Sequence, residues 1–567
     1  MADRTSSHRY VGAVIVIAAL LIRVADFPPR YCMRDMDERP YVQSGLALWE
    51  GITPTYEYSP AGPQIWISWT YAAASSAAHF SHPGPEERSA PAVLRPFVAV
   101  NHALFDVYRD WSLLRWIEVA ANIAVAVAAV AAAFALGVRR GGLAVGIFVG
   151  GLTAALPLFV QLSGEARPYI MGWSLGIIAL YFSAIAFQRR RAATWSAIAM
   201  GLAIGSRVDM LLLLPLAYAD LWYADDNALT ARLRRLLGYT AIVAIASLLI
   251  APWLLTNLMG NLRAIVSVRA ATPTQAPTPL SHILRELVWD QGLIVALLAT
   301  VAAIVLPAPG RPRPRWIAGV YVILLAASIL KATGFGLRHQ GGPITAVIVF
   351  AGAGMAAVAQ RWPRVVWTAV ALGLLLPIIQ SGRDIARRRD RETNDYATLW
   401  LERHVPPGTR IYLSPTIHDP LPTVEASRAI WGEVADPDAW KTKVQSALRR
   451  FSSVSKDLPP ALSEENMIVE RGVCREWFIL GSRTELPDAR FDIRVFSYSE
   501  VFGVREVASE YRKTGGVLIC DDVYAPMPTG MGQPVAQWVG SRGGGVRVYC
   551  SPDVLERLKD PQNLAAW

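Results

Sequence analysis

Residues 113–138 read LLRWIEVAANIAVAVAAVAAAFALGV, and residues 143–161, after a short basic turn, read LAVGIFVGGLTAALPLFVQ. Either run is long enough to cross the hydrocarbon core of a bilayer, which takes about 20 apolar residues in a helix. Arg139 and Arg140 lie between the two runs. Long apolar runs joined by short basic connectors are typical of a multi-span membrane protein.

The composition of the whole chain agrees with these runs. The 567 residues are 53% hydrophobic and 18% charged, with a mean hydropathy of +0.30, whereas a soluble chain carries about 25% charged residues. The net charge of +10 is concentrated in short connectors, so it does not indicate nucleic-acid binding. The cysteines form no C-x-x-C pair, which argues against a thiolate zinc site. Two of the last three are disulfide candidates if they face an oxidising compartment; the cysteines are Cys32, Cys474, Cys520 and Cys550.

We expect about eleven membrane-spanning helices and an uncleaved N-terminal anchor, because no A-x-A site follows the first run. The fifth and sixth runs are short and flank Ser206, Arg207 and Asp209, which indicates a broken or re-entrant segment near one face. The runs cover residues 10–27, 113–138, 143–161, 168–187, 193–205, 210–223, 240–258, 292–306, 316–330, 344–359 and 365–379.

Arginines in the short connectors predict the orientation. The basic clusters that fall on one side lie at residues 139–140, 189–191, 232–235, 311–315 and 361–364. The positive-inside rule assigns that side, together with the N-terminus, to the cytoplasm. The Arg- and Ala-rich composition favours a bacterial inner membrane, with the opposite side periplasmic. Arginines at residues 383–391 are then on the outer side, either as a solvated helix face or in contact with lipid phosphates.

The expected fold class is an α-helical polytopic membrane domain followed by an extracytoplasmic α/β domain. Residues 1–382 form the first, with a first outer loop at 28–111, and residues 383–567 form the second. Short apolar stretches predict strands and two longer patterns predict helices. The strands are expected at 410–413, 477–480, 516–520 and 546–549, and the helices at 393–404 and 439–451.

The first outer loop opens with three carboxylates, Asp35, Asp37 and Glu38, and continues through a Pro/Gly-rich segment that contains Tyr58. Carboxylates beside a bilayer are costly to hold, so they invite a functional explanation. One of them in a protected pocket would deprotonate an acceptor hydroxyl. The alternative is a helix N-terminus decorated with acids, which suits the helix dipole.

A second polar segment, residues 162–169, reads LSGEARPY. Glu165 and Arg167 are two residues apart, so on a helix they do not face each other and would present separate groups to a pocket. Arg167 can hold a phosphate with two hydrogen bonds, and Glu165 can orient a sugar hydroxyl or Arg167 itself. The alternative is an interfacial ion pair that only fixes the loop.

These segments resemble motifs of the GT-C superfamily of membrane glycosyltransferases. The similarity is greatest to protein O-mannosyltransferases and to bacterial lipid A aminoarabinose and galacturonic acid transferases, which carry an Asp-Glu pair after the first span and an S-x-E-A-R-x-Y segment on the second outer loop. The resemblance implies that Asp37 is the catalytic base and that Glu38 supports it, with Asp35 as the fallback. It assigns Glu165, Arg167 and the motif's Tyr169 to the substrate.

A third match is weaker. Arg338 and His339 open a late span, as a related pair does in the family, but Gln340-Gly341-Gly342 departs from the family's more apolar continuation. Arg338 would grip the donor phosphate. Relatives also have a flexible loop over the lipid-phosphate site, at a place that corresponds to residues 256–291. That loop contains Arg263, Arg269, His282 and Arg285, of which Arg269 is the donor candidate and each of which also suits a surface position.

The resemblance implies an inverting hexosyl- or pentosyltransferase that moves a sugar from a polyprenyl phosphate to a hydroxyl of a lipid, glycan or protein acceptor. No cofactor is required and no metal ligand is assigned, although a divalent metal near the acids is compatible with the sequence. A glycan ligase that uses a lipid diphosphate is one alternative. A transporter or flippase is another, and it would show mid-span ionisable groups, paired broken helices and an inverted repeat. The candidate residues instead gather on one face.

Overall fold

The computed structural model describes two compact units, which hold most of the helices and the strands, respectively. The described residues are 2–26, 111–165, 169–223, 229–250, 281, 285–306, 320, 341–389, 410–413, 467–471, 477–482, 493–496, 517–521, 536–538 and 546–550.

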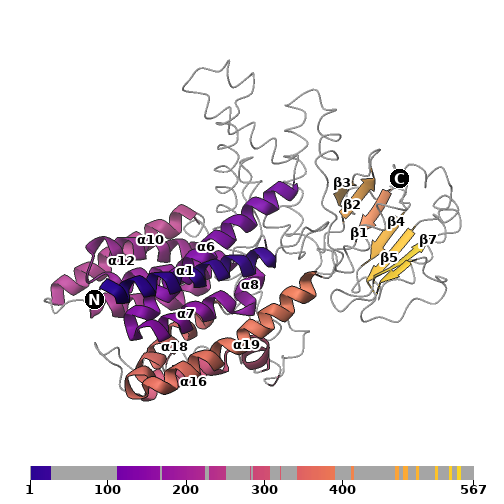
Figure 1. The fold of residues 1–567 in the computed structure, drawn as a ribbon. Helices are drawn as coiled ribbons and strands as arrows, with labels where there is room; N and C mark the ends of the chain where they lie inside the picture. Colours follow the sequence, from indigo (N-terminus) through magenta and orange to yellow (C-terminus); the bar gives the residue numbers. More distant parts are fainter. Residues whose placement is uncertain are drawn as a thin grey trace. The chain divides into compact units, whose positions relative to one another are not determined.

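Within these residues, five helices are long and apolar enough to cross a membrane, and a sixth crossing arises if one bent pair is a single span. The five are α1 (Ala2–Ala25), α6 (Trp111–Gly141), α12 (Leu229–Ile250), α18 (Gly341–Arg361) and α19 (Pro363–Arg389). Figure 1 shows these helices in the helical unit. The chain therefore has the helices of a multi-pass membrane protein. The number eleven stays a prediction, because the run at 316–330 lies outside the described residues except for Val320.

Shorter elements complete the helical unit. They are α7 (Leu143–Ala155), α8 (Pro157–Ser163), α9 (Tyr169–Ile185), α10 (Arg190–Ser206), the 3₁₀ segment η1 (Val208–Leu213), α11 (Leu214–Trp222), the π-helical turn η2 (Glu286–Asp290) and α16 (Ile294–Val305). The break that the sequence indicated around residues 206–209 is present, since α10 ends at Ser206 and η1 follows. The run at 143–161 was expected as one span, but it is two helices bent by 51°.

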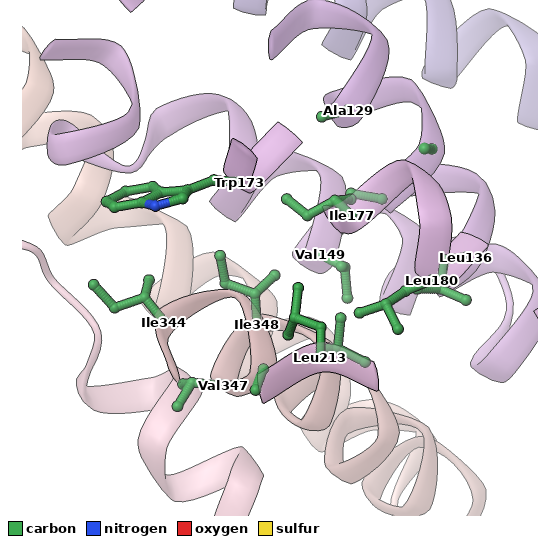
Figure 2. Close-up of a cluster of buried hydrophobic side chains, with 14 of the residues drawn as sticks. Ala129, Leu136, Val149, Trp173, Ile177, Leu180, Leu213, Ile344, Val347 and Ile348 are labelled. Carbon is green, nitrogen blue, oxygen red and sulfur yellow. The ribbon is translucent and has the colours of Figure 1, made fainter. Parts of the chain in front are cut away.

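Small residues allow the helices of this unit to approach closely, which is how helices associate where lipid is as apolar as the side chains. A Cβ on Gly354 of α18 would lie 1.7 Å from the carbonyl oxygen of Ala299 in α16. A Cβ on Gly201 of α10 would lie 2.5 Å from the carbonyl oxygen of Val243 in α12. Larger apolar side chains fill the remaining space, and Figure 2 shows Trp173, Leu213 and Ile348 among them.

Two of the basic turns of the helical unit, after α6 and after α9, are in contact. Arg139, at the end of α6, donates from Nη1 to Oε1 of Gln188 at 2.8 Å, and its guanidinium lies 4.7 Å from the ring centroid of Phe187. Gly142 makes the turn into α7 with a φ of 81°, a conformation that favours glycine. The turn after α6 and the turn after α9 therefore lie on the same side of the bundle, as the distribution of arginines predicted.

The second unit contains a mixed seven-stranded sheet in the order β3-β2-β1-β4-β5-β7-β6. The pairs β1–β4 and β4–β5 are parallel and the other pairs are antiparallel. The strands are β1 (Arg410–Leu413), β2 (Met467–Arg471), β3 (Trp477–Ser482), β4 (Ile493–Phe496), β5 (Val517–Asp521), β6 (Ala536–Trp538) and β7 (Val546–Cys550). Strands β1, β3, β5 and β7 were expected, and β2, β4 and β6 were not. The helices expected at 393–404 and 439–451 lie outside the described residues, and the domain boundary at 382 stays a prediction.

Candidate functional site

Two of the predicted site residues, Glu165 and Tyr169, lie in the described part of the chain. The other predicted site residues lie outside it, so their positions stay predictions: Asp35, Asp37, Glu38, Tyr58, Arg167, Arg269, Arg338 and His339.

The second motif is joined to the end of the first span by a buried arginine. Arg23, in the last turn of α1, is only 1% exposed. Its Nε donates to Oγ of Ser163 at 3.1 Å, and Ser163 in turn donates to the carbonyl oxygen of Phe159 at 2.6 Å. Ser163 is the serine of the LSGEARPY segment, so the end of α1 and the beginning of that segment lie side by side.

Arg23 also binds the break between α7 and α8. Its Nη1 donates to the carbonyl oxygen of Ala154 at 3.1 Å and its Nη2 to that of Thr153 at 3.2 Å. These carbonyls lack their usual helical partners because Pro157 has no N–H and the N–H of Leu158 donates to Oε1 of Gln291 at 2.9 Å. The planar guanidinium suits this task, since it presents several donors in a fixed fork.

Glu165 is held in place by two amide side chains. The Nδ2 of Asn122, in α6, donates to the backbone oxygen of Glu165 at 2.9 Å. The Nε2 of Gln161, one turn earlier in the chain, donates to Oε1 of the Glu165 carboxylate at 3.1 Å. Glu165 is 3% exposed. A carboxylate that is buried and oriented from both its backbone and its side chain is suited to orient a polar ligand group rather than to serve as a surface charge.

Two further carboxylates are buried, one directly after α1 and one in the N-terminal part of α6. Asp26 follows the last turn of α1 and is 1% exposed. Glu118, one turn before Asn122 in α6, is fully buried, and neither of its carboxylate oxygens has a hydrogen-bond partner among the residues that the structure describes. Buried carboxylates in spanning helices mark functional positions by default.

A second polar cluster joins α9, η1 and α18. Nε of Arg207 lies 2.8 Å from Oδ1 of Asp209, and the Arg207 guanidinium lies 4.3 Å from the ring centroid of Tyr169. The other oxygen of Asp209 accepts from the backbone N–H of Gly342 at 3.2 Å. Tyr169, the last residue of the second motif, is thus in contact with an ion pair that also binds the start of α18.

Sequence analysis did not single out Arg23, Asn122 or Gln161. The sequence does contain a signal for these three residues, because each is an ionisable or amide side chain in an otherwise apolar span. Ionisable side chains are rare in such spans and usually have a function. Among the described residues, no three His, Cys, Asp or Glu side chains come together as a metal-binding group.

No protein-family model and no curated protein matches the chain. Among solved structures, apo ArnT from Cupriavidus metallidurans is similar over 98% of this chain and 100% of its own, with 12% identity and a TM-score of 0.46. The same protein bound to undecaprenyl phosphate is similar over 95% and 97%, with 12% identity and a TM-score of 0.39.

The apo oligosaccharyltransferase of Archaeoglobus fulgidus is similar over 70% of this chain, with 12% identity and a TM-score of 0.41, and the chain spans 58% of its length. The function proposed below rests on the residues of this chain. ArnT and the oligosaccharyltransferase are both GT-C membrane glycosyltransferases, the superfamily that the motifs of this sequence resemble.

Proposed function

We propose that this chain is an inverting membrane glycosyltransferase that moves a sugar from a polyprenyl phosphate to an acceptor hydroxyl on the outer face of the membrane. The observation that carries the proposal is the bond from Arg23 to Ser163. It holds the second motif against the helix end from which the chain continues into the acidic segment Asp35–Glu38. The start of the second motif and the C-terminal end of α1, which the acidic segment follows in the sequence, therefore lie side by side.

The proposed reaction is a single in-line displacement. The acceptor oxygen attacks C1 of the sugar, the bond from C1 to the phosphate oxygen breaks, and the acceptor proton passes to the carboxylate of Asp37. The polyprenyl phosphate leaves with the bonding electrons, and C1 is inverted. Glu38 supports the base, and Asp35 is the alternative base.

The leaving phosphate is already charged, so the protein mainly supplies position and electrostatic stabilisation. Arg167 and Arg338 are the proposed phosphate ligands, because a guanidinium binds phosphate with two parallel hydrogen bonds. Arg269 and His339 are further candidates from the outer loops. Glu165, held by Asn122 and Gln161, is suited to orient a sugar hydroxyl.

The sugar and the acceptor are best identified in cells. Mass spectrometry of envelope glycolipids and glycans from a deletion strain, compared with the parent strain, should show the loss of one specific sugar residue. That loss would name both the donated sugar and the acceptor. Identical profiles in the two strains would overturn the proposal.

The base is tested by complementing the deletion strain. Asp37→Asn should leave expression intact and lower transfer by about 100-fold or more, the usual contribution of a general base. Asp290→Asn, which alters an exposed carboxylate in η2, is the control and should restore transfer. Near-normal transfer by Asp37→Asn would remove Asp37 from the role. If the protein were a flippase, the deletion strain would retain its lipid-linked sugar in the inner leaflet.

A further inference from the structure

We propose that the ion pair Arg207–Asp209 is a positioning device for the donor lipid. It fixes the first turns of α9 and α18, and each of these helices begins directly after a basic segment that the proposed function assigns to the donor phosphate. Arg167 precedes α9, and Arg338 precedes α18. This inference rests on the proposed function and adds two residues to it.

Arg207 lies along the first turn of α9. Its guanidinium lies 4.3 Å from the ring centroid of Tyr169, the first residue of that helix. Its aliphatic part packs on Gly172, where an added Cβ would lie 3.2 and 3.3 Å from Cβ and Cγ of Arg207. A glycine at this position is what allows the arginine to lie flat against α9, so the contact covers a full helical turn.

Asp209 joins this turn to α18. Its Oδ1 pairs with Nε of Arg207 at 2.8 Å, and its Oδ2 accepts from the N–H of Gly342 at 3.2 Å, in the first turn of α18. The first N–H groups of a helix have no partner within the helix, and a carboxylate there also suits the helix dipole. One side chain therefore connects Arg207, and through it α9, to the start of α18.

Close contacts explain why α18 begins with two glycines. A Cβ on Gly341 would lie 1.5 Å from Nε1 of Trp173, and a Cβ on Gly342 would lie 2.5 Å from the backbone oxygen of Asp209. Gly341 and Gly342, which belong to the continuation that departs from the family pattern, thus allow α18 to begin in contact with α9 and η1. Apolar side chains of the same three elements also meet, and Figure 2 shows Trp173, Leu213 and Ile344 in one cluster.

The charge of the pair calls for a function beyond packing. The Arg207 and Asp209 side chains are 14% and 21% exposed, so both are largely withdrawn from water. Holding ionised groups in this setting is costly, and an apolar corner of the same shape would pack the helices as well. What the ion pair adds is a fixed geometry between the starts of two helices. A phosphate site that takes one arginine from the segment before each helix requires such a geometry.

The test uses the purified full chain in lipid nanodiscs, with a short-chain polyprenyl phosphate as the probe. Asp209→Ala removes both bonds, whereas Asp209→Asn keeps an oxygen for Gly342 and loses the charge. Arg207→Lys keeps the charge and loses the planar contact with Tyr169. We expect Asp209→Ala to weaken probe binding by about 10- to 100-fold, the scale on which metal affinity falls when a residue that orients the metal ligands is lost, and the two conservative variants to weaken it by less.

The matched control is Asp220→Asn. Asp220 is another partly buried aspartate of the same unit, whose Oδ2 accepts from Oγ of Ser183, in the last turn of α9, at 2.9 Å. This variant should bind the probe as the unmodified protein does. If Asp209→Ala does not fold, Arg207→Lys and Asp209→Asn decide the question through the affinity of the folded fraction.

The outcomes are distinct. If the pair has a structural role only, the Asp209 and Arg207 variants would have a lower unfolding temperature, but their folded fraction would bind the probe with unchanged affinity. That result would overturn the inference. Equal weakening by Asp220→Asn would do the same. If the unmodified protein binds no polyprenyl phosphate, the proposed function itself fails, and this inference fails with it.

Discussion

Replacing Arg23 by methionine should destabilise the helical unit. The change removes the guanidinium but keeps an unbranched apolar side chain of similar length in α1. Of the four hydrogen bonds that Arg23 donates, three cross to other helices, at Ser163, Ala154 and Thr153. Interhelical hydrogen bonds in a membrane protein contribute about 0.6 kcal/mol on average and up to about 1.7 kcal/mol each. The expected loss is therefore about 2 kcal/mol, with an upper value of about 5 kcal/mol.

The substitution also has a stabilising effect, which we expect to be smaller than the loss of hydrogen bonds. Removing a buried charge relieves its desolvation, and replacing buried ionic groups by apolar ones is sometimes stabilising. Here the carbonyls of Thr153 and Ala154 stay behind, already separated from helical partners by Pro157 and by the bond from Leu158 to Gln291. A buried polar group left unpaired costs about 1–3 kcal/mol. Two such groups outweigh the relief, so the sign of the change should be destabilising.

The free energy of unfolding is best measured by SDS titration of the purified protein in mixed micelles, followed by tryptophan fluorescence. Arg9→Met is the matched control, because Arg9 lies on the same helix and is exposed. It should change the free energy by no more than about 0.5 kcal/mol, as surface substitutions do. If Arg23→Met and Arg9→Met unfold alike, the bonds from Arg23 do not stabilise the helix break and the reasoning is wrong.

Two further substitutions test the packing and the site. Gly354→Ala should lower the free energy of unfolding by about 1–3 kcal/mol, because its methyl group would overlap the backbone oxygen of Ala299, whereas Gly238→Ala, with nothing within 4 Å, should be neutral or slightly stabilising in the same titration. Asn122→Leu should lower the initial rate of sugar transfer about tenfold by releasing the backbone of Glu165, while the free energy of unfolding falls by about 1–3 kcal/mol, as when a buried polar group loses a hydrogen bond. An unchanged rate would show that this hydrogen bond does not position Glu165 for transfer.

Sequence reasoning predicted the helices better than the strands, which depend on pairing between distant segments. Apolar length and basic connectors indicated most of the helices, because the bilayer requires a continuous apolar run. The same reasoning missed strands β2, β4 and β6. Strand β2, for example, reads MIVER, in which only three residues are apolar. Pairing with β1 and β3 forms this strand, and such pairing between distant segments is not visible in a short window of sequence.

The candidate site was predictable in part. Residue types and the family resemblance indicated Glu165 and Tyr169, whose roles stay predictions; the structure places Glu165 against Asn122 and Gln161, and Tyr169 against Arg207. Their partners were not predictable, because Asn122 approaches from α6 and Arg207 from the break between α10 and η1. Ser206, Arg207 and Asp209 were noted as a break between short spans, yet only the packing of α9 against η1 gives the ion pair a role.

The break between α7 and α8 bears on the choice between an enzyme and a transporter. Transporters use broken helices because the freed carbonyls coordinate an ion or a substrate. Here, within the described residues, Arg23 binds the carbonyls of Thr153 and Ala154, and the Oγ of Ser381 donates to that of Ala155 at 2.7 Å. Side chains from α1 and α19 thus occupy the positions that a transported ion would need. A helix break whose carbonyls are hydrogen-bonded to side chains in this way has a fixed geometry. Such a geometry suits a site in which Ser163 and Glu165 must keep their positions while a lipid-linked substrate binds.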